Sequence, residues 1–191
     1  MKHIYASVAI LGIAAVLSGV TPAVQALPTQ TLIVQRTAQD FYNRGLQKYK
    51  AGDLKGAITD FTSSIRLNPD VALAYIARGN ALFDQGDLQT ALKDYNQALR
   101  IDPNNAAAYV ERGNTRDDLG DSKAAMEDYN QAIRINPNLA EAYDNRAVTH
   151  ARMGNNQGAI VDWQKAAQLY QQQGNTQRYQ AVLDKIKQLQ Q

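Results

Sequence analysis

The 191-residue sequence contains no cysteine and only two histidines, His3 and His150. The absence of cysteine excludes a disulfide scaffold, a thiolate zinc site, an iron–sulfur cluster and a cysteine nucleophile, and two histidines argue against a histidine-rich metal site. An excess of one charge is also missing, because 20 Lys and Arg residues face 18 Asp and Glu residues. The net charge of +2 is too small to indicate a nucleic-acid-binding protein.

His150 has neither a Ser/His/Asp arrangement nor a nucleotide-binding glycine loop in the sequence around it. A general base needs such partners close by, so His150 is interpreted as a packing or surface residue. These absences favour a protein that is not an enzyme and uses no cofactor and no metal ion.

The segment 1–26 differs in character from the rest of the chain. Lys2 precedes an apolar run from Ile4 to Val20, and the small-residue motif Val24-Gln25-Ala26 follows. This order is typical of a secretory signal peptide, so we expect residues 1–26 to be removed before Leu27. An uncleaved anchor is the alternative, but the run is shorter than the roughly 20 apolar residues that span a bilayer. The sequence therefore predicts a periplasmic, luminal or secreted protein without a stable membrane span.

An internal repeat with a period of about 34 residues dominates the remainder. Pro69, Pro103 and Pro137 are equally spaced, one period apart. Five further columns follow the same spacing: Gly45, Gly79 and Gly113; Arg44, Arg78, Arg112 and Arg146; Asp60, Asp94, Asp128 and Asp162; Phe41, Tyr75, Tyr109 and Tyr143; Phe61, Tyr95, Tyr129 and Trp163. We divide the chain into four repeats at residues 38–71, 72–105, 106–139 and 140–173.

Each repeat has the pattern of a helical hairpin. Apolar residues recur three, four and seven positions apart in both halves of a repeat, as expected for two amphipathic helices. Gly86-Asp87 stands between the halves of the second repeat, and similar pairs stand in the others. In such a pair, glycine adopts the left-handed conformation that ends the first helix, and the Asp or Asn side chain caps the start of the second helix. The proline column then ends the second helix of each repeat. Small residues such as Gly79 and Ala98 allow the paired helices to approach closely.

These columns closely resemble the tetratricopeptide repeat family. The resemblance implies an all-α, right-handed solenoid of helix-turn-helix repeats whose concave surface comes mainly from the first helix of each pair and binds protein segments. Three departures stand out: the Arg column replaces a usual leucine, Ala147 replaces the fourth glycine, and Gln171 replaces the fourth proline. The last two fall in the terminal repeat, where atypical residues are expected.

The arginine column is paired with the aspartate column in our interpretation. The two helices of a hairpin are antiparallel, so the Arg of the first helix and the Asp of the second helix come close to each other. Each Arg is therefore expected to bind an Asp of its own or an adjacent repeat. A row of arginines for acidic ligands is the alternative. The aromatic columns are interpreted as packing residues between repeats.

The concave positions of the family can be carried over to this sequence. They imply a groove that is apolar and aromatic at one end and acidic at the other, with Glu111 and Asp118 adjacent to the acidic end. The amides of Asn80 and Asn114 are expected to bind the backbone of an extended peptide. The predicted groove residues are Tyr42, Leu46, Tyr49, Leu73, Ile76, Asn80, Phe83, Asn114, Asp117, Glu141 and Asp144. The lysines of the family's carboxylate clamp are missing, which argues against chaperone tails as ligands.

Two segments flank the repeats. Residues 27–37 are taken as an N-terminal linker whose apolar strip Leu32-Ile33-Val34 either packs on the first hairpin, is loose or occupies the groove. Residues 174–191 have one apolar face after Gly174-Asn175, with Thr176 as the expected helix cap. They are predicted to form a capping helix for the stack; a partner-binding helix is the alternative.

The sequence thus predicts an exported scaffold or adaptor that binds a peptide segment with hydrophobic and basic parts. An assembly factor or chaperone-like protein for exported clients is the alternative function, and an accessory domain of an enzyme is a weaker one.

Overall fold

The computed structural model describes the backbone of residues 29–191 and the side chains from residue 37 onward. The described part consists of helices and turns, in the order α1 (Thr29–Lys50), α2 (Leu54–Leu67), α3 (Ala72–Gln85), α4 (Leu88–Ile101), α5 (Ala106–Asp118), α6 (Ser122–Ile135), α7 (Ala140–Arg152), α8 (Asn156–Gln172) and α9 (Thr176–Leu189). The predicted signal peptide, residues 1–26, lies outside it.

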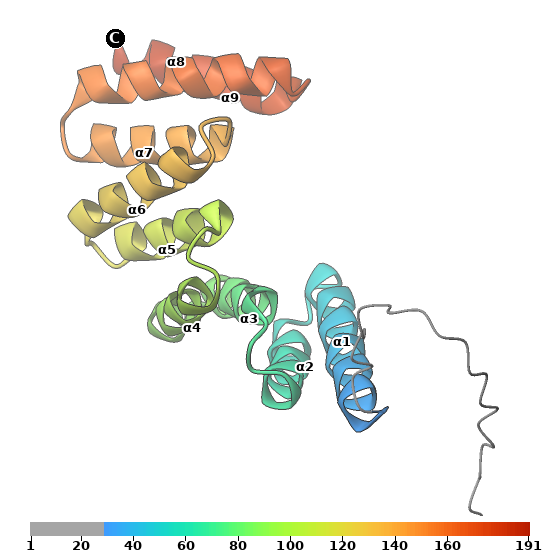
Figure 1. The fold of residues 1–191 in the computed structure, drawn as a ribbon. Helices are drawn as coiled ribbons and strands as arrows, with labels where there is room; N and C mark the ends of the chain where they lie inside the picture. The colour runs from blue at the N-terminus through green and yellow to red at the C-terminus, as the bar shows by residue number, and fades with distance from the viewer. Residues whose placement is uncertain (1–28) are drawn as a thin grey trace, which may run out of the picture.

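The helices follow one another in an arc from α1 to α9 (Figure 1). Each helix packs mainly against its neighbours in sequence, while α1 contacts α3, α3 contacts α5 and α5 contacts α7. Because these first helices of the hairpins touch one another, they line the inner, concave side of the curve. The predicted all-α solenoid of hairpins with a C-terminal capping helix is confirmed.

The hairpin turns have the predicted chemistry. Gly52, Gly86, Gly120 and Gly154 have φ between 80° and 90°, where glycine is favoured over other residues. The carboxylate of Asp87 accepts a hydrogen bond from the backbone N–H of Thr90 at 3.1 Å, and equivalent caps begin α2, α6 and α8. Local sequence therefore fixes where each hairpin bends.

The helices of a hairpin lie close together at the glycine column, where there is no room for a larger side chain. A Cβ atom on Gly79 would lie 2.8 Å from the ring of Tyr95, and one on Gly113 would lie 2.6 Å from the ring of Tyr129. Phe61, Tyr95 and Tyr129 are almost completely buried, which confirms their predicted packing role. The other aromatic column, Phe41, Tyr75, Tyr109 and Tyr143, is only partly buried and lies beneath the arginine column.

The ends of the stack differ from two predictions. Helix α1 begins at Thr29, so most of the expected linker 27–37 is helical; no proline or glycine between Thr29 and Gly45 interrupts the helix. The side chains of the apolar strip lie outside the described part. At the other end Asn175, and not Thr176, caps α9 by accepting from the N–H of Arg178 at 3.1 Å.

Helix α9 covers the end of the last hairpin. Val182 of α9 is completely buried and packs in one cluster with Trp163, Ala166 and Tyr170 of α8. Lacking the proline at residue 171, α8 continues to Gln172 and is longer than the other second helices, which gives α9 a longer surface to cover.

Candidate peptide-binding groove

The arginine and aspartate columns form the predicted ladder. Arg78 donates from Nε and Nη2 to the two carboxylate oxygens of Asp94 at 2.7 and 2.8 Å, and Arg44, Arg112 and Arg146 bind Asp60, Asp128 and Asp162 in the same way. Each pair joins the two helices of one hairpin. The alternative of free arginines for acidic ligands does not agree with these contacts.

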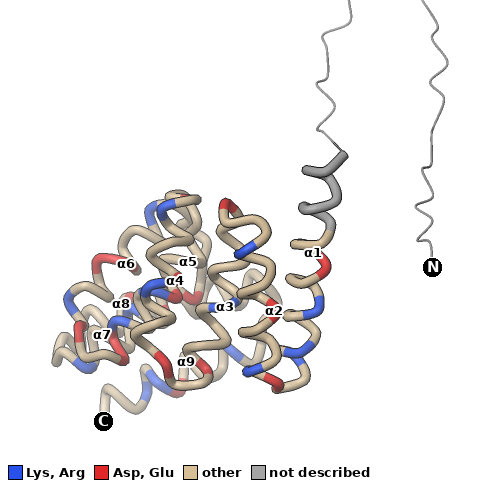
Figure 2. The backbone as a smooth tube through the Cα atoms, turned by 90° about the horizontal axis from the view of Figure 1, so that it is seen from below, with Lys and Arg blue, Asp and Glu red and all other residues tan. Residues whose placement is uncertain are grey.

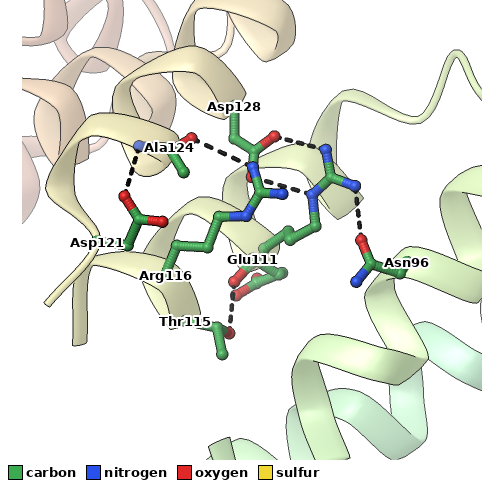
Figure 3. A network of polar contacts seen from close by, with 8 residues as sticks. Asn96, Glu111, Thr115, Arg116, Asp121, Ala124 and Asp128 are labelled. Atoms are coloured by element: carbon green, nitrogen blue, oxygen red, sulfur yellow. Dashed lines mark hydrogen bonds and ion pairs between the residues drawn. The ribbon is translucent and has the colours of Figure 1, made fainter. Parts of the chain in front are cut away.

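Three of these arginines also reach the preceding repeat. Arg78 donates to Thr62 at 3.1 Å, Arg112 to Asn96 at 2.8 Å and Arg146 to Asn130 at 2.5 Å. The acceptors stand one period apart, so their spacing was a signal that the sequence contained. Figure 3 shows the arrangement around Asp128, where the guanidinium of Arg116 joins that of Arg112. The ladder therefore fixes neighbouring repeats relative to each other.

Six of the predicted groove residues come together in one pocket on α1 and α3. Tyr42, Leu46, Tyr49, Leu73, Ile76 and Asn80 line a pocket of about 140 Å³ together with Phe61 and Ala77. Leu73 is 55% exposed at its edge. The structure therefore brings these six apolar, aromatic and amide side chains together, and their role in peptide binding stays a prediction.

A second pocket lies farther along the concave side. Its volume is about 210 Å³, and it brings together three predicted residues, Phe83, Asn114 and Asp117, with Asp118, Tyr129, Asn145, Val148 and Arg152. Arg152 was missed by the sequence analysis because its equivalents in the other repeats are Lys50, Asp84 and Asp118, which form no column of one charge. Glu141 and Asp144 of α7 line neither pocket.

Asp117 and Asp144 do not supply free negative charge to the groove. Asp117 is 6% exposed, binds Arg152 at 2.9 Å and accepts hydrogen bonds from Ser122 and Thr149. Asp144 is 4% exposed, binds Lys185 at 2.7 Å and accepts from Nε1 of Trp163 at 3.0 Å. Both were expected as ligand-binding carboxylates, but cations from the following elements, α7 and α9, already neutralise them.

The two asparagines are also engaged inside the protein. The side-chain oxygen of Asn80 accepts from the hydroxyl of Tyr95 at 2.7 Å, and that of Asn114 accepts from Tyr129 at 2.9 Å. The oxygen of Asn114 accepts a second bond from Asn145 at 2.8 Å. The amide oxygens of both residues therefore hold buried tyrosines in place, and the binding of a peptide backbone by Asn80 and Asn114 stays a prediction.

Glu111 carries the most perturbed carboxyl group of the concave side. Burial, followed by the charges of Glu141 and Asp84, raises the pKa of Glu111 to about 7, while a hydrogen bond from Asn114 opposes the rise. Burial raises the pKa of Tyr95, and the charge of Glu111 adds to the rise for both Tyr95 and Tyr49. Burial and hydrogen bonding to Asp84 raise the pKa of Tyr49 to about 12.

Replacing Glu111 with Gln should remove a pH dependence of stability. The pKa of Glu111 in the folded state lies above its ordinary value, so folding favours the neutral carboxyl group. The contribution of this group to stability is complete below about pH 4.5 and is lost as the pH rises through about 7. At pH 8 the Glu111→Gln variant should therefore be more stable than the wild type by about 1–3 kcal/mol. Thermal unfolding at pH 5 and pH 8 measures this, with Glu127→Gln on the exposed surface of α6 as the control. If the two variants changed the thermal stability equally at both pH values, the raised pKa of Glu111 would be contradicted.

The sequence matches the model described as "TPR repeat" over residues 45–86, 79–120 and 113–154, and the model described as "Tetratricopeptide repeat" over residues 139–173. The chain belongs to the tetratricopeptide repeat family. Proteins of this family are generally non-catalytic scaffolds that bind other proteins, and the fold supports such a role here. No curated protein sequence matches the chain.

Solved structures with the same fold include MamA, with a TM-score of 0.67 and 22% identity over 76% of this chain and 86% of that one. The Arabidopsis OM64 TPR domain has a TM-score of 0.61 and 26% identity, covering 62% of this chain and 98% of that one. The first TPR of Spaghetti (RPAP3), bound to the HSP90 peptide SRMEEVD, has a TM-score of 0.61 and 23% identity. The match covers 63% of this chain and 95% of that one. Within the described residues no helix is long and apolar enough to cross a membrane.

Proposed function

We propose that this protein is an exported scaffold or adaptor that binds an extended segment of a partner protein in its concave groove. The observation that carries the proposal is the pocket on α1 and α3, which gathers six predicted groove residues around an exposed Leu73. Exposed apolar surface that lines a concavity is typical of a binding site. A tetratricopeptide repeat domain of the same fold bound to a peptide gives further support.

Export is part of this proposal and rests on residues 1–26 alone. Their basic start, apolar run and small residues before Leu27 are those of a cleaved secretory signal. The protein recovered from its native cells should then begin at Leu27, which mass spectrometry of the N-terminal peptide detects. An intact Met1 on the recovered protein would refute cleavage.

Replacing Leu73 with Ser should weaken partner binding without unfolding the protein. Burying a leucine side chain in an interface contributes roughly 1.5–3 kcal/mol, so binding should fall by about 10- to 100-fold. Because Leu73 is 55% exposed, stability should change by no more than about 0.5 kcal/mol. The measurement is capture of partners by residues 27–191 from the native envelope fraction, followed by titration of each purified partner.

The matched control is Val161→Ser. Val161 is 53% exposed on α8, so the control removes similar apolar surface outside the groove pockets. Unchanged binding by the Leu73 variant, or equal loss in both variants, would place the binding surface elsewhere. The number of captured proteins separates the two functions: an adaptor retains one partner, whereas an assembly factor or chaperone-like protein binds many clients that exchange rapidly.

A further inference from the structure

Three carboxylates on the first helices of consecutive repeats have no cation in the described part of the chain. Asp84 of α3, Glu111 of α5 and Glu141 of α7 form no ion pair there, whereas the buried carboxylates Asp60, Asp94, Asp117, Asp128, Asp144 and Asp162 are all paired. Two of the paired groups, Asp117 and Asp144, also lie on first helices, but they are buried there and bind Arg152 and Lys185. Asp84, Glu111 and Glu141 are the more exposed members of these helices, which line the concave side.

The repeat register places the three carboxylates at positions whose equivalents line the two pockets: Glu111 corresponds to Ala77 and Asn145, Glu141 to Leu73, and Asp84 to Asp118 and Arg152. The charges of Asp84 and Glu141 both raise the pKa of Glu111, and Glu111 in turn acts on Tyr49 of α1. Four successive first helices thus bring polar groups close to one another. The nearest arginines in sequence do not relieve the repulsion, because the guanidinium groups of Arg112 and Arg116 both bind Asp128 (Figure 3).

The acidic region is continuous with the apolar pocket. Tyr49 lines that pocket and donates its hydroxyl to a carboxylate oxygen of Asp84 at 2.5 Å. Asn80, another lining residue, accepts from Tyr95, whose ring packs against Gly79. One extended segment lying along α1, α3 and α5 therefore meets an apolar cavity and then a negative surface. Basic and acidic residues are elsewhere interspersed along the stack (Figure 2).

We infer that the partner segment bound in the groove is a basic, apolar peptide: it places an aliphatic or aromatic side chain in the pocket lined by Tyr42, Leu46 and Leu73, and Lys or Arg side chains opposite Asp84, Glu111 and Glu141. This inference rests on the proposed function and specifies its ligand. Charge complementarity carries it, because three unpaired carboxylates on a concave surface attract cations and repel acidic segments. A metal ion does not explain the cluster, since no group of three such side chains within the described residues has metal-binding spacing.

The test uses a library of short random peptides displayed on phage and the mature chain, residues 27–191. We expect enrichment of peptides that combine Lys or Arg with Leu, Ile or aromatic residues. A capped synthetic peptide of the enriched sequence should bind, and its affinity should fall by about tenfold or more between roughly 50 and 300 mM salt. The triple variant Asp84→Asn, Glu111→Gln and Glu141→Gln should bind it about 10- to 100-fold more weakly and lose most of this salt dependence.

The control makes the same change of charge outside the groove, through Asp40→Asn, Asp70→Asn and Glu127→Gln, all at exposed positions. It should keep nearly the full affinity, and both triple variants should keep their helical far-UV spectrum. Enrichment of neutral or acidic peptides whose binding depends on Leu73 would overturn the inference and leave the groove function standing. If no peptide is enriched, both the inference and the groove as a peptide site fail.

Discussion

Replacing Arg78 with Met is expected to lower the free energy of unfolding by about 3–5 kcal/mol, the usual loss when one partner of a buried ion pair is removed. The side chain of Asp94 is 6% exposed, and Arg78 supplies its only cation among the described residues. The variant also loses the hydrogen bond to Thr62 and the stacking of the guanidinium 5.8 Å from the centre of the Tyr75 ring. Urea unfolding measures the difference.

The matched control is Arg112→Met in the next repeat. Asp128 keeps a second cation there, because Arg116 binds it at 2.8 Å, whereas Leu82 stands at the equivalent position of the second repeat. The control should therefore lose clearly less stability than Arg78→Met. A double variant, Arg78→Met with Asp94→Leu, should recover much of the loss, since an apolar pair of similar volume replaces the buried charge. Equal losses in the two single variants would show that the ladder acts through packing and not through charge.

The elements that could be predicted from the sequence are those that recur with the period of the repeats. Equivalent positions of the four repeats have the same structural surroundings. The turn glycines, the helix caps and the Arg–Asp ladder were therefore each supported by several positions of the sequence. The residues of the apolar half of the groove could be predicted in the same way, because the concave positions recur with the period of the repeats. Periodic features of this kind need only local structure and contacts between adjacent helices.

The acidic half of the groove was predicted less well because its partners break the period. Asp117 is neutralised by Arg152, and Asp144 by Lys185 of α9, which lies outside the repeats. Neither cation belongs to a column, so no pattern in the sequence signals that these carboxylates are buried. The sequence places Glu111 only beside the groove, although burial and the charges of Glu141 and Asp84 raise the pKa of this carboxyl group to about 7. The extent of α1 is missed for a similar reason, since residues 29–37 precede the first repeat.

Deleting residues 174–191 should destabilise the last repeat before the others. Helix α9 buries Val182 against Trp163 and Tyr170, and it places the ammonium of Lys185 within 2.7 Å of Asp144 on α7. The deletion therefore exposes the apolar surface of α8 and leaves the carboxylate of Asp144 without its cation. The expected loss is roughly 1.5–3 kcal/mol for each aliphatic side chain whose burial is lost, such as Val182. Water reaches the carboxylate of Asp144 once α9 is removed, so the loss of its ion pair adds less than a buried unpaired charge would.

Native-state hydrogen exchange locates this loss. Since each repeat is held mainly by its neighbours, amides of α7 and α8 should exchange much faster in the truncated protein, amides of α5 and α6 moderately faster, and those of α1 to α4 little faster. Val182→Asp in the full chain should give the same gradient, because it places an unpaired charge at a completely buried position of α9. Removal of residues 190 and 191 alone, beyond the end of α9, is the control and should change nothing. Uniformly faster exchange in all four hairpins would instead show that the stack unfolds as one cooperative unit, in which case α9 stabilises the first repeat as much as the last.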